Sequence, residues 1–71
     1  MKKEVLLKVG ANVRRMREKR GYSQMELAEK SDSHINYIGG VERGERNATA
    51  FKLYKIAQAL GCKPSLLFKG L

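Results

Sequence analysis

The chain has 71 residues, with 15 Lys and Arg against 7 Asp and Glu, which gives a net charge of +8. This length allows one small domain, and an isoelectric point near 10.0 favours an anionic partner, nucleic acid before an anionic membrane surface. The single cysteine, Cys62, excludes an internal disulfide framework and is expected to be a small buried apolar residue. No apolar run approaches the roughly 18 residues of a membrane span.

Residues 3–20 are expected to form the first helix. Apolar residues recur there at spacings of three and four, the period of one helical face, at Leu6, Val9, Val13 and Met16. Gly10 interrupts this stretch and is expected to weaken the helix by about 1 kcal/mol relative to alanine. Eight basic residues against two acidic ones make residues 2–20 strongly positive.

Two short helices joined by a tight turn are expected next, over residues 23–31 and 34–43. Ser23 and Glu26 have the spacing of a capping box. The second helix carries a single apolar stripe, at Ile35, Ile38 and Val41. Helices this short are not stable alone in water, so neighbouring segments must hold them. The pair is typical of a helix-turn-helix motif, whose second helix enters the major groove of DNA.

The charge of this motif is unusual for a DNA-binding element. Residues 21–47 contain three basic and five acidic residues, and His34 to Val41 carries no formal charge. If this helix enters a groove, the flanking basic segments must supply the attraction to phosphates.

Two further helices complete the chain. Thr49 caps a helix over residues 50–60 that ends at Gly61, and Pro64 favours a short fifth helix over residues 64–68. No segment alternates apolar and polar residues, so no strand is predicted. We therefore expect an all-α fold, a compact five-helix bundle in which residues 1–71 form one domain.

Several matched elements, in order along the chain, carry a family resemblance. They are Ser23-Gln24, Glu26-Leu27-Ala28, Tyr37-Ile38, Val41-Glu42-Arg43-Gly44, Arg46-Asn47, Leu53, Ile56-Ala57 and Ala59-Leu60-Gly61. This pattern resembles the XRE family of helix-turn-helix repressors, which includes the DNA-binding domains of the phage lambda repressor and Cro. The run from Tyr37 to Arg43 is also similar to the controller proteins of restriction–modification systems.

The resemblance implies that the start of the second motif helix reads bases, through His34, Ile35 and Asn36. Asn36 can bond adenine in bidentate fashion, and Ile35 can pack on a thymine methyl group. Two other interpretations remain open at this stage. Ile35 can belong to the core, and His34 or Asn36 can simply cap the helix.

The same resemblance implies that six residues contact DNA phosphates. Gln24 opens the first motif helix, and the others lie in or after the second helix: Tyr37, Arg43, Arg46, Asn47 and Lys52. The alternative is an ordinary solvated loop with surface arginines. Arg17 and Glu42 match a structural ion pair of several relatives. Asp32 stands where relatives often have glycine, and Gly40 either lets the helix approach DNA closely or has no functional role.

These observations predict a sequence-specific transcriptional regulator that binds double-stranded DNA. One protomer offers too few base contacts to find a genomic site, so we expect a homodimer on a palindromic operator. Its interface is expected on the last helix, at Leu66, Leu67 and Phe68, unless these residues close the protomer's own core. An antitoxin-like protein-interaction module is the alternative function.

Other function classes find no support in the sequence. No nucleophile–base pair, metal-ligand cluster or phosphate-cradling loop is present, so we expect no enzymatic activity, cofactor, metal or small-molecule ligand. The expected location is the cytoplasm of a prokaryotic cell, close to the nucleoid.

Overall fold

The computed structural model describes residues 2–71, and that range contains helices and no strands. The elements are α1 (Lys3–Lys19), α2 (Gln24–Lys30), α3 (Ile35–Glu42), α4 (Ala50–Leu60) and η1 (Pro64–Phe68). The all-α prediction is confirmed, and the helix bounds agree with the expected ones to within one or two residues. The fifth element is a 3₁₀ helix, the form that short terminal turns often take.

Local sequence signals set most of the helix ends. The Ser23 side chain accepts a hydrogen bond from the Glu26 amide, and the Glu26 carboxylate accepts one from the Ser23 amide, so the capping box is formed. Hydrogen bonding from the Ser23 amide, and then from the Ser23 side chain, lowers the pKa of the Glu26 carboxyl group. Thr49 caps α4 by accepting from the Lys52 amide, and Gly61 ends α4 with a φ of 70°.

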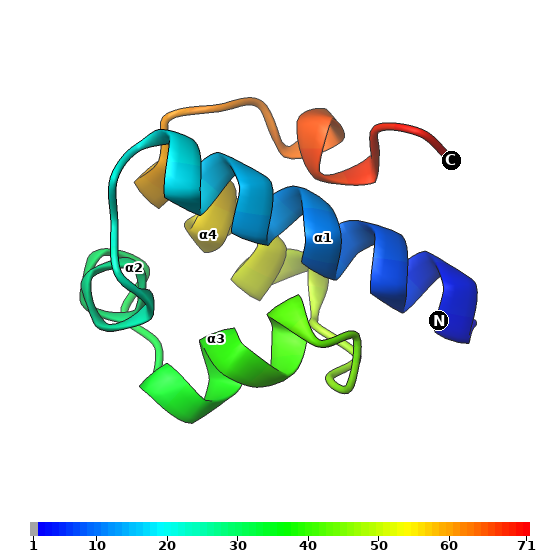
Figure 1. The fold of residues 1–71 in the computed structure, drawn as a ribbon, viewed down its shortest axis with the longest axis horizontal. Helices are drawn as coiled ribbons and strands as arrows, with labels where there is room; N and C mark the ends of the chain where they lie inside the picture. The colour runs from blue at the N-terminus through cyan, green and yellow to red at the C-terminus, as the bar shows by residue number, and fades with distance from the viewer. Residues whose placement is uncertain (1) are drawn as a thin grey trace.

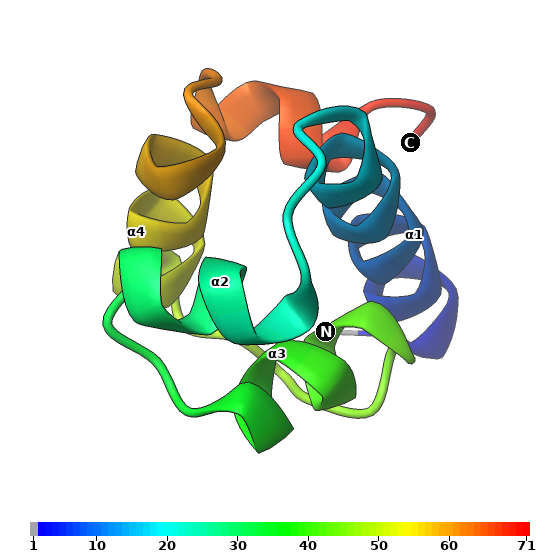
Figure 2. The same ribbon diagram turned by 60° about the vertical axis from the view of Figure 1, so that its left-hand side comes forward.

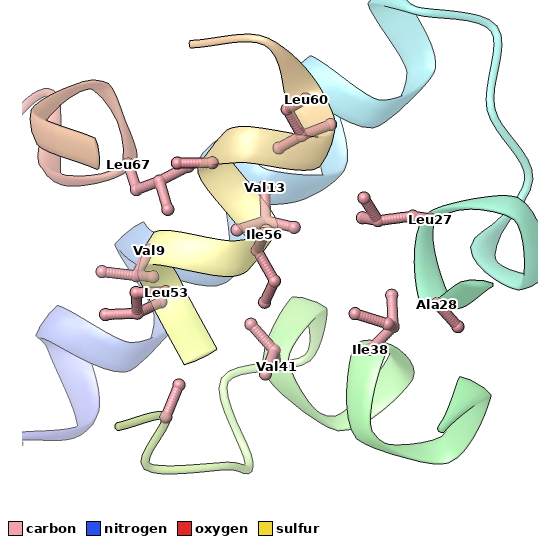
Figure 3. Packing of buried hydrophobic residues seen from close by; sticks show 12 residues of the cluster. Val9, Val13, Leu27, Ala28, Ile38, Val41, Leu53, Ile56, Leu60 and Leu67 are labelled. Atoms are coloured by element: carbon pink, nitrogen blue, oxygen red, sulfur yellow. The ribbon is translucent and has the colours of Figure 1, made fainter. Parts of the chain in front are cut away.

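The helices lie around one core (Figures 1 and 2). α1 and α4 form its two sides, α2 and α3 lie at one end, and η1 lies across the other end. Apolar side chains from all five elements converge between them, as Figure 3 shows. The buried hydrophobic residues are Val9, Val13, Leu27, Ala28, Ile38, Val41, Ala48, Leu53, Ile56, Ala57, Leu60 and Leu67.

Gly10 lies where α1 crosses the end of α3. A methyl group built on Gly10 would lie 2.6 Å from the Glu42 carbonyl oxygen and would also contact the Val41 carbonyl oxygen. Both neighbours are backbone atoms of another helix, so they cannot move aside as a side chain can. The glycine that helix propensity counts as a weakness is therefore what allows the two helices to pack at this distance.

Asn12 is a buried polar residue that the apolar pattern of α1 did not reveal. It is 2% exposed, and its Nδ2 donates to the carbonyl oxygens of Leu67, at 2.8 Å, and Lys69, at 3.0 Å. One amide side chain thus satisfies two carbonyls at the end of η1 and fixes η1 against α1.

The expectation for Leu67 is wrong. Leu67 has no exposed surface and packs in the protomer's own core, so it cannot contact a second subunit. Leu66 and Phe68, on either side of it, are 42% and 38% exposed. The sequence could not separate these three neighbours because a five-residue helix is too short to display a period.

Candidate nucleic-acid interface

The start of α3 is turned towards solvent at the end of the molecule opposite η1 (Figure 1). His34 and Asn36 are exposed, whereas Ile35 and Tyr37 are half-buried against the core. The His34 side chain caps α3, because its Nδ1 accepts a hydrogen bond of 3.0 Å from the Asn36 amide. The Asn36 side chain takes no part in that bond and remains available to a ligand.

Tyr37 stands within a small cationic cluster. The Arg46 guanidinium carbon lies 5.7 Å from the centre of its ring, and the Lys52 ammonium nitrogen lies 5.6 Å from it. Partial burial raises the pKa of the Tyr37 phenol, and the Arg46 charge opposes that shift. The neutral phenol of Tyr37, on α3, therefore has two positive charges close to its ring.

Two arginines cover the paired glycines of α3. A methyl group built on Gly40 would lie 2.6 Å from Cγ of Arg46, and one built on Gly39 would lie 3.0 Å from a guanidinium nitrogen of Arg43. Both glycines are buried. The idea that Gly40 brings the helix close to DNA is therefore wrong, because Arg46 occupies that position.

An interior ion pair holds the end of α3. Glu42 accepts from Arg17 Nε at 2.6 Å and Nη2 at 3.1 Å, and from Gln24 Nε2 at 3.0 Å. The Arg17 guanidinium also donates to the Tyr22 carbonyl oxygen at 2.9 Å. Hydrogen bonding to Glu42 raises the pKa of Arg17. The predicted Arg17–Glu42 pair is confirmed, and it joins α1, α3 and the start of α2.

The turn between α2 and α3 is fixed from α4. Asp32 adopts a φ of 54°, the left-handed conformation that a relative's glycine would favour. Lys52 Nζ donates to the Asp32 carbonyl oxygen at 3.1 Å and to Ser33 Oγ at 3.3 Å, and Lys55 Nζ lies 3.1 Å from Asp32 Oδ2. Lys52, expected to bind phosphate, is thus engaged in positioning the motif.

The remaining predicted phosphate ligands lie at the ends of α2 and α3. Arg43 is exposed and pairs with Glu45 at 3.0 Å, and Asn47 is exposed in the loop after α3. Lys3 was not foreseen: its Nζ donates to the Gly44 carbonyl oxygen at 3.2 Å, which brings the basic start of α1 to this same loop. Four cations thus lie next to α3 or to the segments before and after it: Lys3, Arg43, Arg46 and Lys52. α3 carries no positive charge of its own.

Within residues 2–71, no cluster of three or more metal-ligating side chains occurs. None of the helices described there is both long and apolar enough to cross a membrane.

Comparison with known proteins agrees with this geometry. The helix-turn-helix family model matches residues 13–67. Control protein C.SmaI of Serratia marcescens is 47% identical over 66 residues, which are 92% of this chain and 75% of that protein. The crystal structure of the restriction–modification controller protein C.AhdI from Aeromonas hydrophila superimposes with a TM-score of 0.87 at 43% identity, covering 89% of this chain and 96% of that one.

A second solved structure holds DNA. The restriction–modification controller protein C.Esp1396I, crystallised as a tetramer with its natural 35 base-pair operator, matches with a TM-score of 0.83 at 34% identity, over 92% of this chain and 86% of that one. The family model covers α2, α3 and α4 in full, together with the second part of α1. The chain therefore belongs to the helix-turn-helix family that contains these control proteins.

Proposed function

We propose that this protein is a transcriptional regulator that binds double-stranded DNA as a homodimer, with the start of α3 in the major groove. The observation that carries the proposal is the exposed, uncharged start of α3, held outward by the buried Arg17–Glu42 pair and flanked by cations. That arrangement separates base reading from phosphate attraction. Such a regulator works in the cytoplasm of a prokaryotic cell, where the chromosome lies.

Base reading is assigned to Asn36, with His34 beside it. Both side chains are exposed at the end of the helix that enters the groove first. Ile35 packs against the core, which leaves only part of its side chain for a thymine methyl group. Arg43, Arg46 and Asn47 are assigned to the phosphates. One N–H of the Gln24 amide is held by Glu42, and the second is free to meet a phosphate.

Replacing Asn36 by alanine is expected to relax base preference at one operator position, by about 1–3 kcal/mol of discrimination, and to leave the fold intact.

Replacing Arg46 by glutamine keeps the carbon stem over Gly40 and removes the charge. This variant is expected to bind all DNA sequences more weakly. The slope of the logarithm of the binding constant against the logarithm of salt concentration should fall in magnitude by about one.

The measurement begins with selection of bound duplexes from a random library, followed by anisotropy titrations of each variant at several salt concentrations. The two variants are controls for one another, because only one should alter selectivity. An Asn36→Ala protein with unchanged preference at every position would contradict the assignment of base reading.

The homodimer needs an interface beside the recognition helices. The two-fold axis of a palindrome passes between the half-sites, so the subunits must meet side by side with both α3 helices on the DNA. η1 lies at the opposite end of the protomer from α3, so contacts through η1 would lie far from the DNA-binding end (Figure 1). We therefore propose the outer face of α4 in place of η1.

That face of α4 has the chemistry of a subunit contact. Phe51 and Tyr54 are 66% and 51% exposed and lie one helical turn apart. Lys55 lies over the Phe51 ring at 5.4 Å, and Asp32 balances its charge. Exposed aromatic residues with a balanced charge can be buried against a second copy with little repulsion.

Replacing Phe51 by aspartate is expected to yield a monomer at micromolar concentration, whereas Leu66→Asp should remain a dimer. Both side chains are exposed, so neither change reaches the core. Sedimentation equilibrium measures the outcome. Dissociation by Leu66→Asp and not by Phe51→Asp would restore the interface on η1.

A further inference from the structure

An apolar groove with a cationic rim lies on the side of the molecule away from α3. It has a volume of about 470 Å³ and runs between the ends of α1 and α4 and the start of η1. A smaller hollow of about 130 Å³ adjoins it and shares Met16, Lys19 and Leu66 with it. Because they share these residues, we treat them as one continuous trough beside α1 and η1.

The floor and the rim of this trough differ sharply in character. The floor is apolar, formed by Met16, Leu60, Cys62 and Leu66. The rim carries five cations, Arg15, Lys19, Arg20, Lys63 and Lys69, and among residues 2–71 no acidic side chain lines either hollow.

Arg20 is fixed in this rim. Its Nη2 donates to the Gly61 carbonyl oxygen at 3.5 Å, and its guanidinium lies where a methyl group on Gly61 would otherwise be. Gly61 has a φ of 70°, so the residue that ends α4 also makes room for the arginine. One positive charge of the rim thus lies next to the end of α4 and beside the apolar floor.

DNA held by α3 does not account for these five cations. α3 and η1 lie at opposite ends of the protomer, with the core between them (Figures 1 and 2). A second copy of this chain does not suit the trough either, because it would place five positive charges against five others. Phosphates, in turn, offer no apolar surface to bury on Leu66.

From this combination we infer that the trough binds an acidic amphipathic segment of a partner protein, whose apolar side chains meet the floor and whose carboxylates meet the rim. An apolar floor with a charged rim is the kind of groove into which an amphipathic helix lays its apolar face. The inference goes beyond DNA binding, and it requires only that α3 and the trough face different ways. A regulator bound to its operator would then present this surface to another protein.

The test uses a fluorescein-labelled 16-residue helical peptide with leucines on one face and glutamates on the other, added to the full chain without DNA. Anisotropy should show saturable binding that weakens as sodium chloride is raised. A peptide with lysines in place of the glutamates should not bind. Because no DNA is present, failure of this test leaves the proposed DNA-binding function unaffected.

Matched variants locate the site. Lys19→Glu reverses a rim charge and should weaken peptide binding about fivefold or more. Lys2→Glu changes the net charge by the same amount outside the trough. This control should change peptide affinity less than about twofold. Leu66→Ser should also weaken binding, since Leu66 is part of the floor and is 42% exposed.

Cys62 gives an independent readout from inside the trough. Burial raises the pKa of its thiol, so it reacts slowly with iodoacetamide at neutral pH and faster at higher pH. Bound peptide should slow that reaction further.

Three results would overturn the inference. The first is that Lys19→Glu and Lys2→Glu weaken peptide binding equally. The second is that duplex DNA, and not the peptide, protects Cys62 from iodoacetamide. The third is that protection of Cys62 depends on protein concentration alone. The second would assign the trough to nucleic acid, and the third to a second copy of the chain.

Discussion

Replacing Glu42 by alanine is expected to lower the free energy of unfolding by about 3–5 kcal/mol. The Glu42 side chain is 4% exposed and that of Arg17 is 12% exposed. Removing the carboxylate leaves a guanidinium inside the protein with one carbonyl partner, at Tyr22, and frees the Gln24 amide. A domain of this size has a total stability of about 4–10 kcal/mol, so the variant is expected to be partly or fully unfolded at 37 °C.

The measurement is urea denaturation followed by circular dichroism at 222 nm. Glu45→Ala is the matched control, because Glu45 also pairs with an arginine, Arg43, but the side chains are 60% and 55% exposed. Its loss should cost less than about 1 kcal/mol. Equal stability of the two variants would show that the buried pair does not hold α3 in place.

A second substitution is expected to act against helix propensity. Gly10→Ala replaces glycine in the middle of α1, which propensity alone predicts to stabilise the helix by about 1 kcal/mol. We expect the opposite, a loss of about 1–3 kcal/mol, because the new methyl group meets the backbone of α3 at Val41 and Glu42.

Gly39→Ala provides the control for this prediction. Gly39 is also inside a helix, but the atom nearest to its new methyl group is the exposed end of Arg43, which can move aside. That variant should be equally stable or slightly more stable than the original protein in the same denaturation experiment. A Gly10→Ala protein that also gained stability would mean that α1 and α3 can separate without cost.

The two basic surfaces clarify the charge balance of the molecule. The cations around α3, Lys3, Arg43, Arg46 and Lys52, lie at one end, and the five of the trough rim lie towards the other. Nine of the fifteen Lys and Arg residues are therefore divided between these two surfaces. The surface around α3 suits the phosphates of DNA, and the trough suits an anion with an apolar side.

Local sequence signals were sufficient for the helices and for the motif. The capping box at Ser23, the Thr49 cap and the glycine after α4 depend on neighbours within four residues, so the sequence alone determined where helices begin and end. The apolar stripes of α1, α3 and α4 likewise indicated the face that each of these helices turns towards the core. Family resemblance added the pairing of Arg17 with Glu42 across 25 positions of the chain.

Only the tertiary structure decided which side chains are free. It showed that Lys52 binds the turn before α3, that Arg46 covers Gly40, and that Leu67 is core while Leu66 is not. It also brought Arg15 and Lys63 to the rims of adjoining hollows from segments far apart in sequence. The physical reason is that hydrogen bonding and periodicity act within a helical turn, whereas exposure, close approach and clustered charge depend on which helices pack together.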